Sequence, residues 1–174
     1  MCPSTPARRG YRAVAILAVL VSVLPACGRP PALADTQASP EALMREVLQA
    51  IERRDRSRLE ALAISEAEFR DHVWEYLPAS RPERNLPMSY VWGDLHQKSV
   101  GHLSRVLGES GGRHWDVVSV RFEGQPRSYG PFVIHGAPKV RARTPGGEEQ
   151  ELTVCGSLLE QAGRWKVFSF VADD

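Results

Sequence analysis

The strongest constraint on the fold is a change of pattern at Arg113. Before it, apolar residues recur at the three- and four-residue spacing of amphipathic helices. After it, short runs rich in Val, Phe and Leu alternate with Gly, Pro and charged turns, which is typical of strands. A chain with its helices first and its strands afterwards packs the helices on one face of an antiparallel sheet. We therefore expect one α+β domain within these 174 residues, with a sheet of about four to five strands.

Two cap signals place the helices. Ser39 precedes Pro40 and an acid, which is an N-cap followed by residues that suit a first helical turn. Residues 65–68 read Ser-Glu-Ala-Glu, the pattern of a capping box. The spacing of apolar residues then predicts four helices: one from residue 40 into the charged run at 52–58, and others over 59–64, 66–77 and 89–107, with a proline-rich loop at 78–87 and a glycine-rich stop at 108–112.

Five short apolar runs predict the strands, and they cover residues 115–122, 129–135, 139–143, 151–159 and 164–171. The run at 139–143 alternates charged and apolar residues, so one of its faces is expected to meet water. The last run places Val167, Phe168 and Phe170 on both of its faces. That pattern predicts a central strand, or one covered on both sides by a helix and a partner.

The first 26 residues indicate a processing segment. Three arginines and no acid precede an apolar stretch over residues 13–24, which matches the charge pattern and length of a secretory signal peptide. Because about 20 apolar residues are needed to cross a bilayer, the stretch is short for a membrane helix.

The end of that stretch is more specific, because Leu24-Pro25-Ala26-Cys27 resembles the lipobox of bacterial lipoproteins. The resemblance implies that a signal peptidase cuts before Cys27 and that Cys27 then carries acyl chains. An ordinary cleaved signal peptide and a membrane helix with an incidental cysteine are the alternatives. Residues 8–11, Arg-Arg-Gly-Tyr, also resemble a twin-arginine export signal. By analogy with lipoproteins of enteric bacteria, Gly28 implies anchoring in the outer membrane, with the domain facing the periplasm.

Cleavage at that point divides the chain into a signal peptide at 1–26, a flexible tether at 27–39 and a single α+β domain at 40–174. Loss of the three leader arginines lowers the 22 basic residues to 19 against 21 acidic ones, so the formal charge moves from +1 to about −2. That balance argues against a broad nucleic-acid-binding surface. Cys155 has no disulfide partner in the mature chain, and its apolar neighbours predict a small core residue.

The segment 156–168, Gly-Ser-Leu-Leu-Glu-Gln-Ala-Gly-Arg-Trp-Lys-Val-Phe, resembles the closing hairpin of NTF2-like (cystatin-like α+β) proteins. In many of these a strand, a Gly-Arg-Trp-Lys turn and an apolar strand end the domain. The resemblance implies a cone-shaped fold with a curved sheet, a pocket between helix and sheet, and often a homodimer through the sheet. It transfers no catalytic residue, because the family shares a shape and includes both enzymes and binding modules.

The predicted fourth helix carries the most candidate functional side chains. Helical spacing places four of them on one face: Trp92, His96, Ser99 and Leu103. A histidine among large apolar residues can act as a general base or bind a ligand in a pocket, although a core-edge histidine bonded to the backbone is the commoner case. Asp94 is a candidate carboxylate partner for His96, but its spacing from Lys98 is that of a surface ion pair.

Three polar residues of the predicted strands, Arg121, Tyr129 and His135, are expected near the mouth of a ligand pocket, with plain strand surface as the alternative. Together with Trp92 and His96 they form the predicted ligand-binding set. His135 is also a candidate catalytic residue beside His96.

Two further patterns suggest chemistry but have simpler structural explanations. Glu68, His72 and Glu75 share one side of the predicted third helix, as ligands of a divalent metal would. Charged residues beside an apolar stripe, however, normally lie in solvent. The run Gly-Glu-Ser-Gly-Gly at 108–112 matches G-x-S-x-G, but that motif needs a strand before the serine and a helix after it, the reverse of the order here. We expect neither a metal nor a cofactor.

These observations favour a membrane-anchored envelope lipoprotein whose domain binds a small apolar ligand or a protein partner without catalysis, because no acid–base pair or nucleophile is evident. Two alternatives stay open. One is a pocket lyase, isomerase or hydrolase that uses His96 with a nearby carboxylate. The other is an envelope assembly protein that docks a partner through its sheet. A cavity holding His96 and a carboxylate would favour the enzyme, and an exposed apolar sheet face above a few hundred Å² would favour docking.

Overall fold

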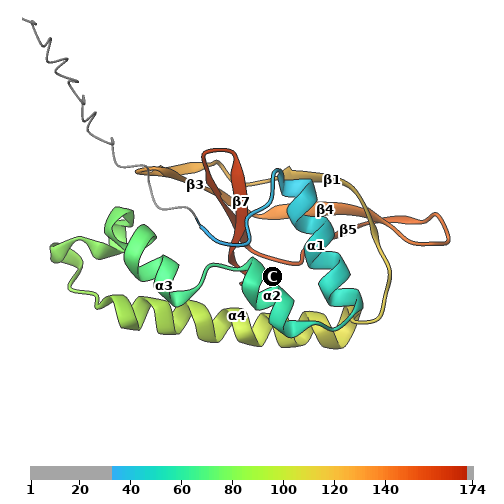
Figure 1. The fold of residues 1–174 in the computed structure, drawn as a ribbon, viewed down its shortest axis with the longest axis horizontal. Coiled ribbons are helices and arrows are strands. Elements are labelled where there is room, and N and C mark those ends of the chain that lie inside the picture. The colour runs from blue at the N-terminus through green and yellow to red at the C-terminus, as the bar shows by residue number, and fades with distance from the viewer. Residues whose placement is uncertain (1–32, 172–174) are drawn as a thin grey trace, which may run out of the picture.

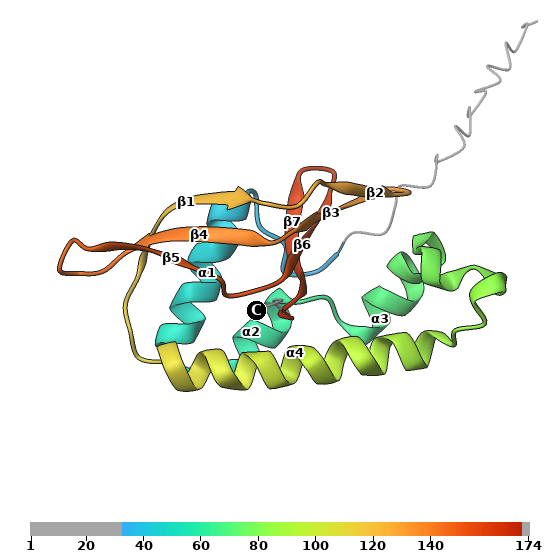
Figure 2. The same cartoon turned by 180° about the vertical axis from the view of Figure 1, so that it is seen from behind.

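The computed structural model describes residues 33–171. Its helical half contains α1 (Pro40–Glu52), α2 (Arg56–Leu62), α3 (Glu66–Glu68) and α4 (Met88–Ser110). Between α3 and α4 the chain forms a π-helix, η1 (Phe69–Val73), and three 3₁₀ turns, η2 (Trp74–Tyr76), η3 (Pro78–Ser80) and η4 (Pro82–Arg84). Figures 1 and 2 show α4 running along one side of the molecule, with the strands on the opposite side and α1 and α2 between them.

Seven strands form two antiparallel sheets. One sheet has the order β1-β4-β5 and the other the order β2-β3-β6-β7. Their bounds are β1 (Asp116–Phe122), β2 (Arg127–Tyr129), β3 (Phe132–Gly136), β4 (Pro138–Arg143), β5 (Glu149–Leu152), β6 (Ser157–Gln161) and β7 (Arg164–Ser169). The predicted α+β class is confirmed. The described residues form seven strands where the sequence predicted five, because two of the predicted runs are each divided into two strands.

The first interruption is a tight turn in the run predicted at 129–135. Tyr129 pairs with Phe132, which leaves Gly130 and Pro131 to reverse the chain between β2 and β3. Gly130 has a φ of +56°, and a Cβ at this position would collide with the ring of Tyr76. The turn therefore needs glycine both for its backbone conformation and for the close approach of η2.

The second interruption lies in the run predicted at 151–159. β5 ends at Leu152 and β6 begins at Ser157, so the chain passes from one sheet to the other through the buried pair Val154 and Cys155. Complete burial raises the pKa of the Cys155 thiol to about 12. The prediction of a core residue at this position is confirmed.

The first helix forms as its sequence predicts. The Ser39 hydroxyl accepts a hydrogen bond from the backbone N–H of Ala42, and Pro40 occupies the first turn. The apolar face of α1 is fully buried and packs against β1, β7, α2 and α4. With residues of both sheets it forms the larger core, whose most completely buried members include Leu43, Met44, Val47, Leu59, Leu62, Val140, Leu158 and Val167.

The capping box at residues 65–68 is confirmed, although the α-helix that it opens has only three residues before the chain continues as the π-helix η1. Ile64, just before the cap, and Phe69, four residues after it, both lie in a second core cluster, which is the contact of a hydrophobic staple. Ile64 also donates its backbone N–H to the carbonyl of Val167. The start of α3 is thereby fixed to the edge of β7.

The segment 33–39, predicted as part of the flexible tether, is instead attached to the folded domain. Gln37 and Trp165 exchange two backbone hydrogen bonds of 2.8 Å, and Leu33 is only 6% exposed in the second core. The backbone of Ala34 donates to Glu68 and accepts from Lys166. The described part of the predicted tether therefore extends β7 at its edge, and the other tether residues, 27–32, lie outside the described residues.

The remaining N-terminal predictions, the signal peptide and the lipid on Cys27, also lie outside the described residues. None of the helices within residues 33–171 has the length and hydrophobicity of a bilayer-spanning segment.

Candidate functional site

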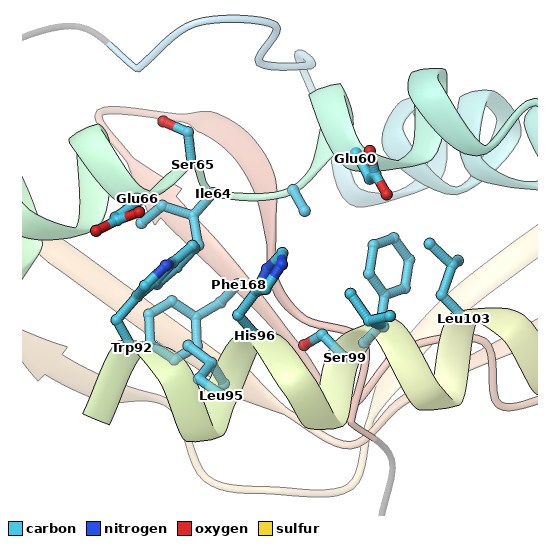
Figure 3. A pocket seen from close by; sticks show the side chains of 13 residues that line it. Glu60, Ile64, Ser65, Glu66, Trp92, Leu95, His96, Ser99, Leu103 and Phe168 are labelled. Atoms are coloured by element: carbon cyan, nitrogen blue, oxygen red, sulfur yellow. The ribbon is translucent and has the colours of Figure 1, made fainter. Parts of the chain in front are cut away.

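An open pocket of about 350 Å³ lies between α4, the α2–α3 connection and β7. Figure 3 shows its floor formed by α4, its opposite wall by the chain around Ile64 and Ser65, and Phe168 behind. Apolar side chains provide most of the lining: Ala63, Ile64, Trp92, Leu95, Val100, Leu103, Phe168 and Phe170. A concave, mainly apolar site of this size suits a small ligand.

The α4 side of the pocket confirms the face predicted from helical spacing. All four residues of that face, Trp92, His96, Ser99 and Leu103, line the pocket. They do so because positions three and four apart on a helix point the same way. His96 stacks on Trp92 with a ring-centre distance of 5.5 Å and remains exposed to solvent, and Figure 3 shows its imidazole directed into the pocket.

The wall of the pocket at Trp92 rests on the buried ring of Phe69. Phe69 is fully buried at the start of η1, with its ring centre 5.3 Å from Trp92 and 6.5 Å from Phe168. π-helical turns are rare and often occur beside functional sites. Here the π-helix places Phe69 beneath two of the aromatic rings that face the ligand space.

The polar groups that the described chain contributes to the pocket are carboxylates, hydroxyls and one imidazole, with no lysine or arginine among them. Glu60 is held by Arg56, with a distance of 2.9 Å between carboxylate and guanidinium. The Glu66 carboxylate forms no hydrogen bond or ion pair within the described chain, and its helical neighbour Arg70 instead forms a two-bond contact with Asp71. The imidazole nitrogens of His96 likewise form no hydrogen bond within the described chain. The pocket therefore offers a free carboxylate and a free imidazole.

Beside the pocket lies a polar cluster of opposite character, which we call the seam: the buried side chains of Glu68 and Lys166, with the exposed residues Ala34 and Ser65 bonded to them. Lys166 is 3% exposed, and its ammonium lies 3.0 Å from the Glu68 carboxylate. Burial on its own would raise the pKa of Glu68, but hydrogen bonds from Ser65, Lys166 and Ala34 outweigh it and hold that pKa below its usual value. Every carboxylate oxygen of Glu68 is engaged, so the seam is structural.

The position of Glu68 bears on the possible metal site at Glu68, His72 and Glu75 of the predicted third helix. The expectation that Glu68 lies in solvent is wrong, because Lys166 reaches it from β7. Within residues 33–171, no cluster of three acidic, histidine or cysteine side chains has a geometry that could hold a metal ion. The second motif, at residues 108–112, ends α4, with Gly112 at a φ of +88° after the helix.

Asp94, the predicted carboxylate partner of His96, does not lie in the pocket. It is exposed and pairs with Lys98 at 2.8 Å, as the spacing of those two residues also suggested. Residues two apart on a helix face different ways, so Asp94 and His96 cannot share a site. The carboxylates near His96 are those of Glu60 and Glu66, which come from other elements.

His135 is also remote from the pocket, although it is well placed structurally. Its Nε2 lies 3.0 Å from a carboxylate oxygen of Glu160 on the neighbouring strand. Its ring packs against Phe122 and Trp165, with ring-centre distances of 5.0 Å and 4.7 Å. His135 is therefore a packed, paired residue that joins β3, β6 and the first sheet, and it does not line the pocket between α4 and β7.

Arg121 and Tyr129 were predicted beside the same mouth, and neither lines it. Arg121 lies on the outer face of β1, where it forms ion pairs with Glu123 and Glu151. That face continues in further pairs of Arg141 and Arg143 with Glu149, so the outer surface of the first sheet is charged. Tyr129 is half-buried in β2, at the turn next to Tyr76.

Sequence reasoning missed the pocket residues that come from outside α4: Glu60, Ala63, Ile64, Ser65, Glu66, Phe168 and Phe170. Two local signals were present. Ile64 stands in the staple position before a capping box, and Phe168 lies in a strand that is apolar on both faces. What brings them to α4 is the pairing of residues 63 and 64 with Val167, a long-range contact.

No family model matches the chain, and no curated protein or solved structure matches it either.

Proposed function

We propose that this protein is a lipid-anchored binding module of the bacterial cell envelope, whose pocket between α4 and β7 holds a small, largely apolar ligand without converting it. The observation that carries the proposal is the pocket itself: about 350 Å³, lined mostly by aromatic and aliphatic side chains, with a few polar groups that are free to orient a ligand. Its place between a helix and a sheet agrees with what the resemblance to NTF2-like proteins implies.

The test is a titration with N-phenyl-1-naphthylamine, an apolar dye whose emission rises when it leaves water. Wild-type protein is expected to bind it saturably. Ser99→Trp fills the pocket and should weaken binding at least about tenfold. Gln97→Trp adds the same indole to α4 at an exposed position outside the pocket lining, so it should bind like the wild type. Equal affinities for the two variants, at matched melting temperatures, would contradict the proposal.

The anchor is tested separately through Cys27, which the lipobox resemblance assigns as the acylated residue. Cys27→Ala should move the protein from the membrane fraction to the soluble fraction or leave an uncleaved precursor, and it should remove labelling by a palmitate analogue. If the variant still takes up the lipid label, the anchor is not on this cysteine.

A pocket enzyme is the second candidate, and one observation favours it: His96 and the carboxylates of Glu60 and Glu66 line the same pocket. A general base needs hydrogen-bond contact with its partner and substrate, and within the described chain His96 has no such bond to either glutamate. Hydrolysis of p-nitrophenyl butyrate is one measurable test. If the protein hydrolyses this ester faster than buffer alone, and His96→Ala abolishes the excess rate, the function is catalysis rather than binding.

A further inference from the structure

The charge distribution of the pocket identifies the class of ligand. Among residues 33–171, its lining holds two carboxylates, one imidazole and two hydroxyls, with no lysine or arginine. We propose that the ligand is a small amine, with an apolar aromatic or aliphatic body and a protonated nitrogen that Glu66 receives. This inference rests on the proposed binding function and adds the chemistry of the ligand.

Glu66 is the carboxylate available to such a ligand. Glu60 is already neutralised by Arg56, which also hydrogen-bonds Ser104. The nearest competitor for Glu66 on its own helical face is Arg70, whose guanidinium makes bonds of 2.7 Å and 2.9 Å to Asp71. Its attraction to Glu66 is therefore weak, and a ligand cation would find the Glu66 carboxylate unpaired.

Trp92 supplies the second element of cation recognition, through the part of its indole that His96 and Phe69 leave open to the pocket. An ammonium within reach of an indole face is attracted by the ring quadrupole. In Figure 3 the Glu66 carboxylate stands toward the Trp92 end of the pocket, while Glu60 stands toward the Leu103 end. The apolar body of the ligand would lie against Leu95, Leu103 and Phe168.

A carboxylate ligand of the same size fits the pocket less well. Its charge would enter a site that holds the unpaired Glu66 carboxylate and, among the described residues, no lysine or arginine, so desolvation and repulsion both oppose it. A fatty acid or other apolar acid is therefore disfavoured by the same residues that favour an amine.

The experiment compares three ligands that share one apolar body: 2-naphthylmethylamine, 2-naphthalenemethanol and 2-naphthoate. Each displaces N-phenyl-1-naphthylamine at pH 7.5 in low salt. We expect the amine to bind about tenfold more tightly than the alcohol, and the acid to bind more weakly than both. The preference for the amine should shrink as salt screens the exposed carboxylate.

The matched variants are Glu66→Gln and Glu109→Gln. Both remove one exposed carboxylate, but only Glu66 lines the pocket, since Glu109 lies at the far end of α4. Glu66→Gln should remove the amine preference and leave the affinity for the alcohol unchanged, while Glu109→Gln should retain the preference. Saturable binding of the alcohol without any amine preference, or an amine preference that survives Glu66→Gln, would overturn the ligand class and leave the binding function standing. Failure of all three ligands to bind would overturn both.

Discussion

Glu66 and Glu68 lie two residues apart at the start of α3 and have opposite environments. Glu68 is the buried carboxylate of the seam, where Ala34, Ser65 and Lys166 occupy its oxygens. Glu66 lines the open pocket, and its carboxylate has no hydrogen bond or ion pair within the described chain. The difference indicates which polar group maintains the fold and which is available to a ligand, because a buried carboxylate must be fully bonded whereas an exposed one need not be.

The largest expected change is a loss of stability when the Lys166 ammonium is removed from the seam. Lys166→Met leaves Glu68 buried without its cation and should lower the free energy of unfolding by about 3–5 kcal/mol. Urea denaturation followed by circular dichroism measures it. Glu66→Gln is the control and should change the free energy by less than about 0.5 kcal/mol. If the two variants were equally stable, the contrast between seam and pocket would be wrong.

The next largest change is the loss of stability when residues 33–37, which supply Ala34 to the seam, are removed. A chain that begins at residue 38 lacks Leu33, Ala34 and Gln37, and should be about 2–4 kcal/mol less stable than one that begins at residue 33. The loss combines a buried leucine with the backbone bonds to Trp165 and Glu68. Thermal unfolding of the two chains compares them directly, and identical melting temperatures would show that residues 33–37 do not belong to the domain.

The pH dependence of stability tests whether the Glu68 carboxylate is bonded in the folded protein. The folded protein holds the pKa of Glu68 below its usual value. Its stabilising contribution is therefore present above the pKa of the unfolded chain and is lost as the pH falls through the folded pKa. The stability difference between the wild type and Glu68→Gln should narrow on acidification in that range. A difference that stayed constant with pH would contradict the bonding of the carboxylate.

The smallest expected effect lies in the aromatic wall of the pocket. Trp92→Leu keeps an apolar side chain but removes the indole face, so it should weaken the binding of 2-naphthylmethylamine several-fold and that of 2-naphthalenemethanol less. Competition titrations measure both ligands. Equal losses for the two would mean that Trp92 contributes only apolar contact.

The sequence predicted those parts of the site that depend on local geometry. Helical spacing placed Trp92, His96, Ser99 and Leu103 on one face, and all four line the pocket. The capping box predicted how Ser65 and Glu68 bond to each other. In each case the information lies within a few residues of one helix.

Long-range contacts could not be predicted in the same way. Lys166 meets Glu68 across 98 positions of the chain. Gln37 pairs with Trp165 through backbone atoms alone, which is why a segment rich in alanine and polar residues could be mistaken for a tether. His135 was expected at the pocket, but its position depends on the register of β3 with β6 and its contacts with Phe122.

The most direct test of the central claim, that the pocket between α4 and β7 is a binding site, is an NMR titration of ¹⁵N-labelled protein with 2-naphthalenemethanol. We expect saturable chemical-shift changes centred on His96, Ser99 and Phe168 and on the indole N–H of Trp92, with the His135 signal unchanged. Shifts centred on the charged face of β1 and β4, or the absence of any saturable shift, would contradict it.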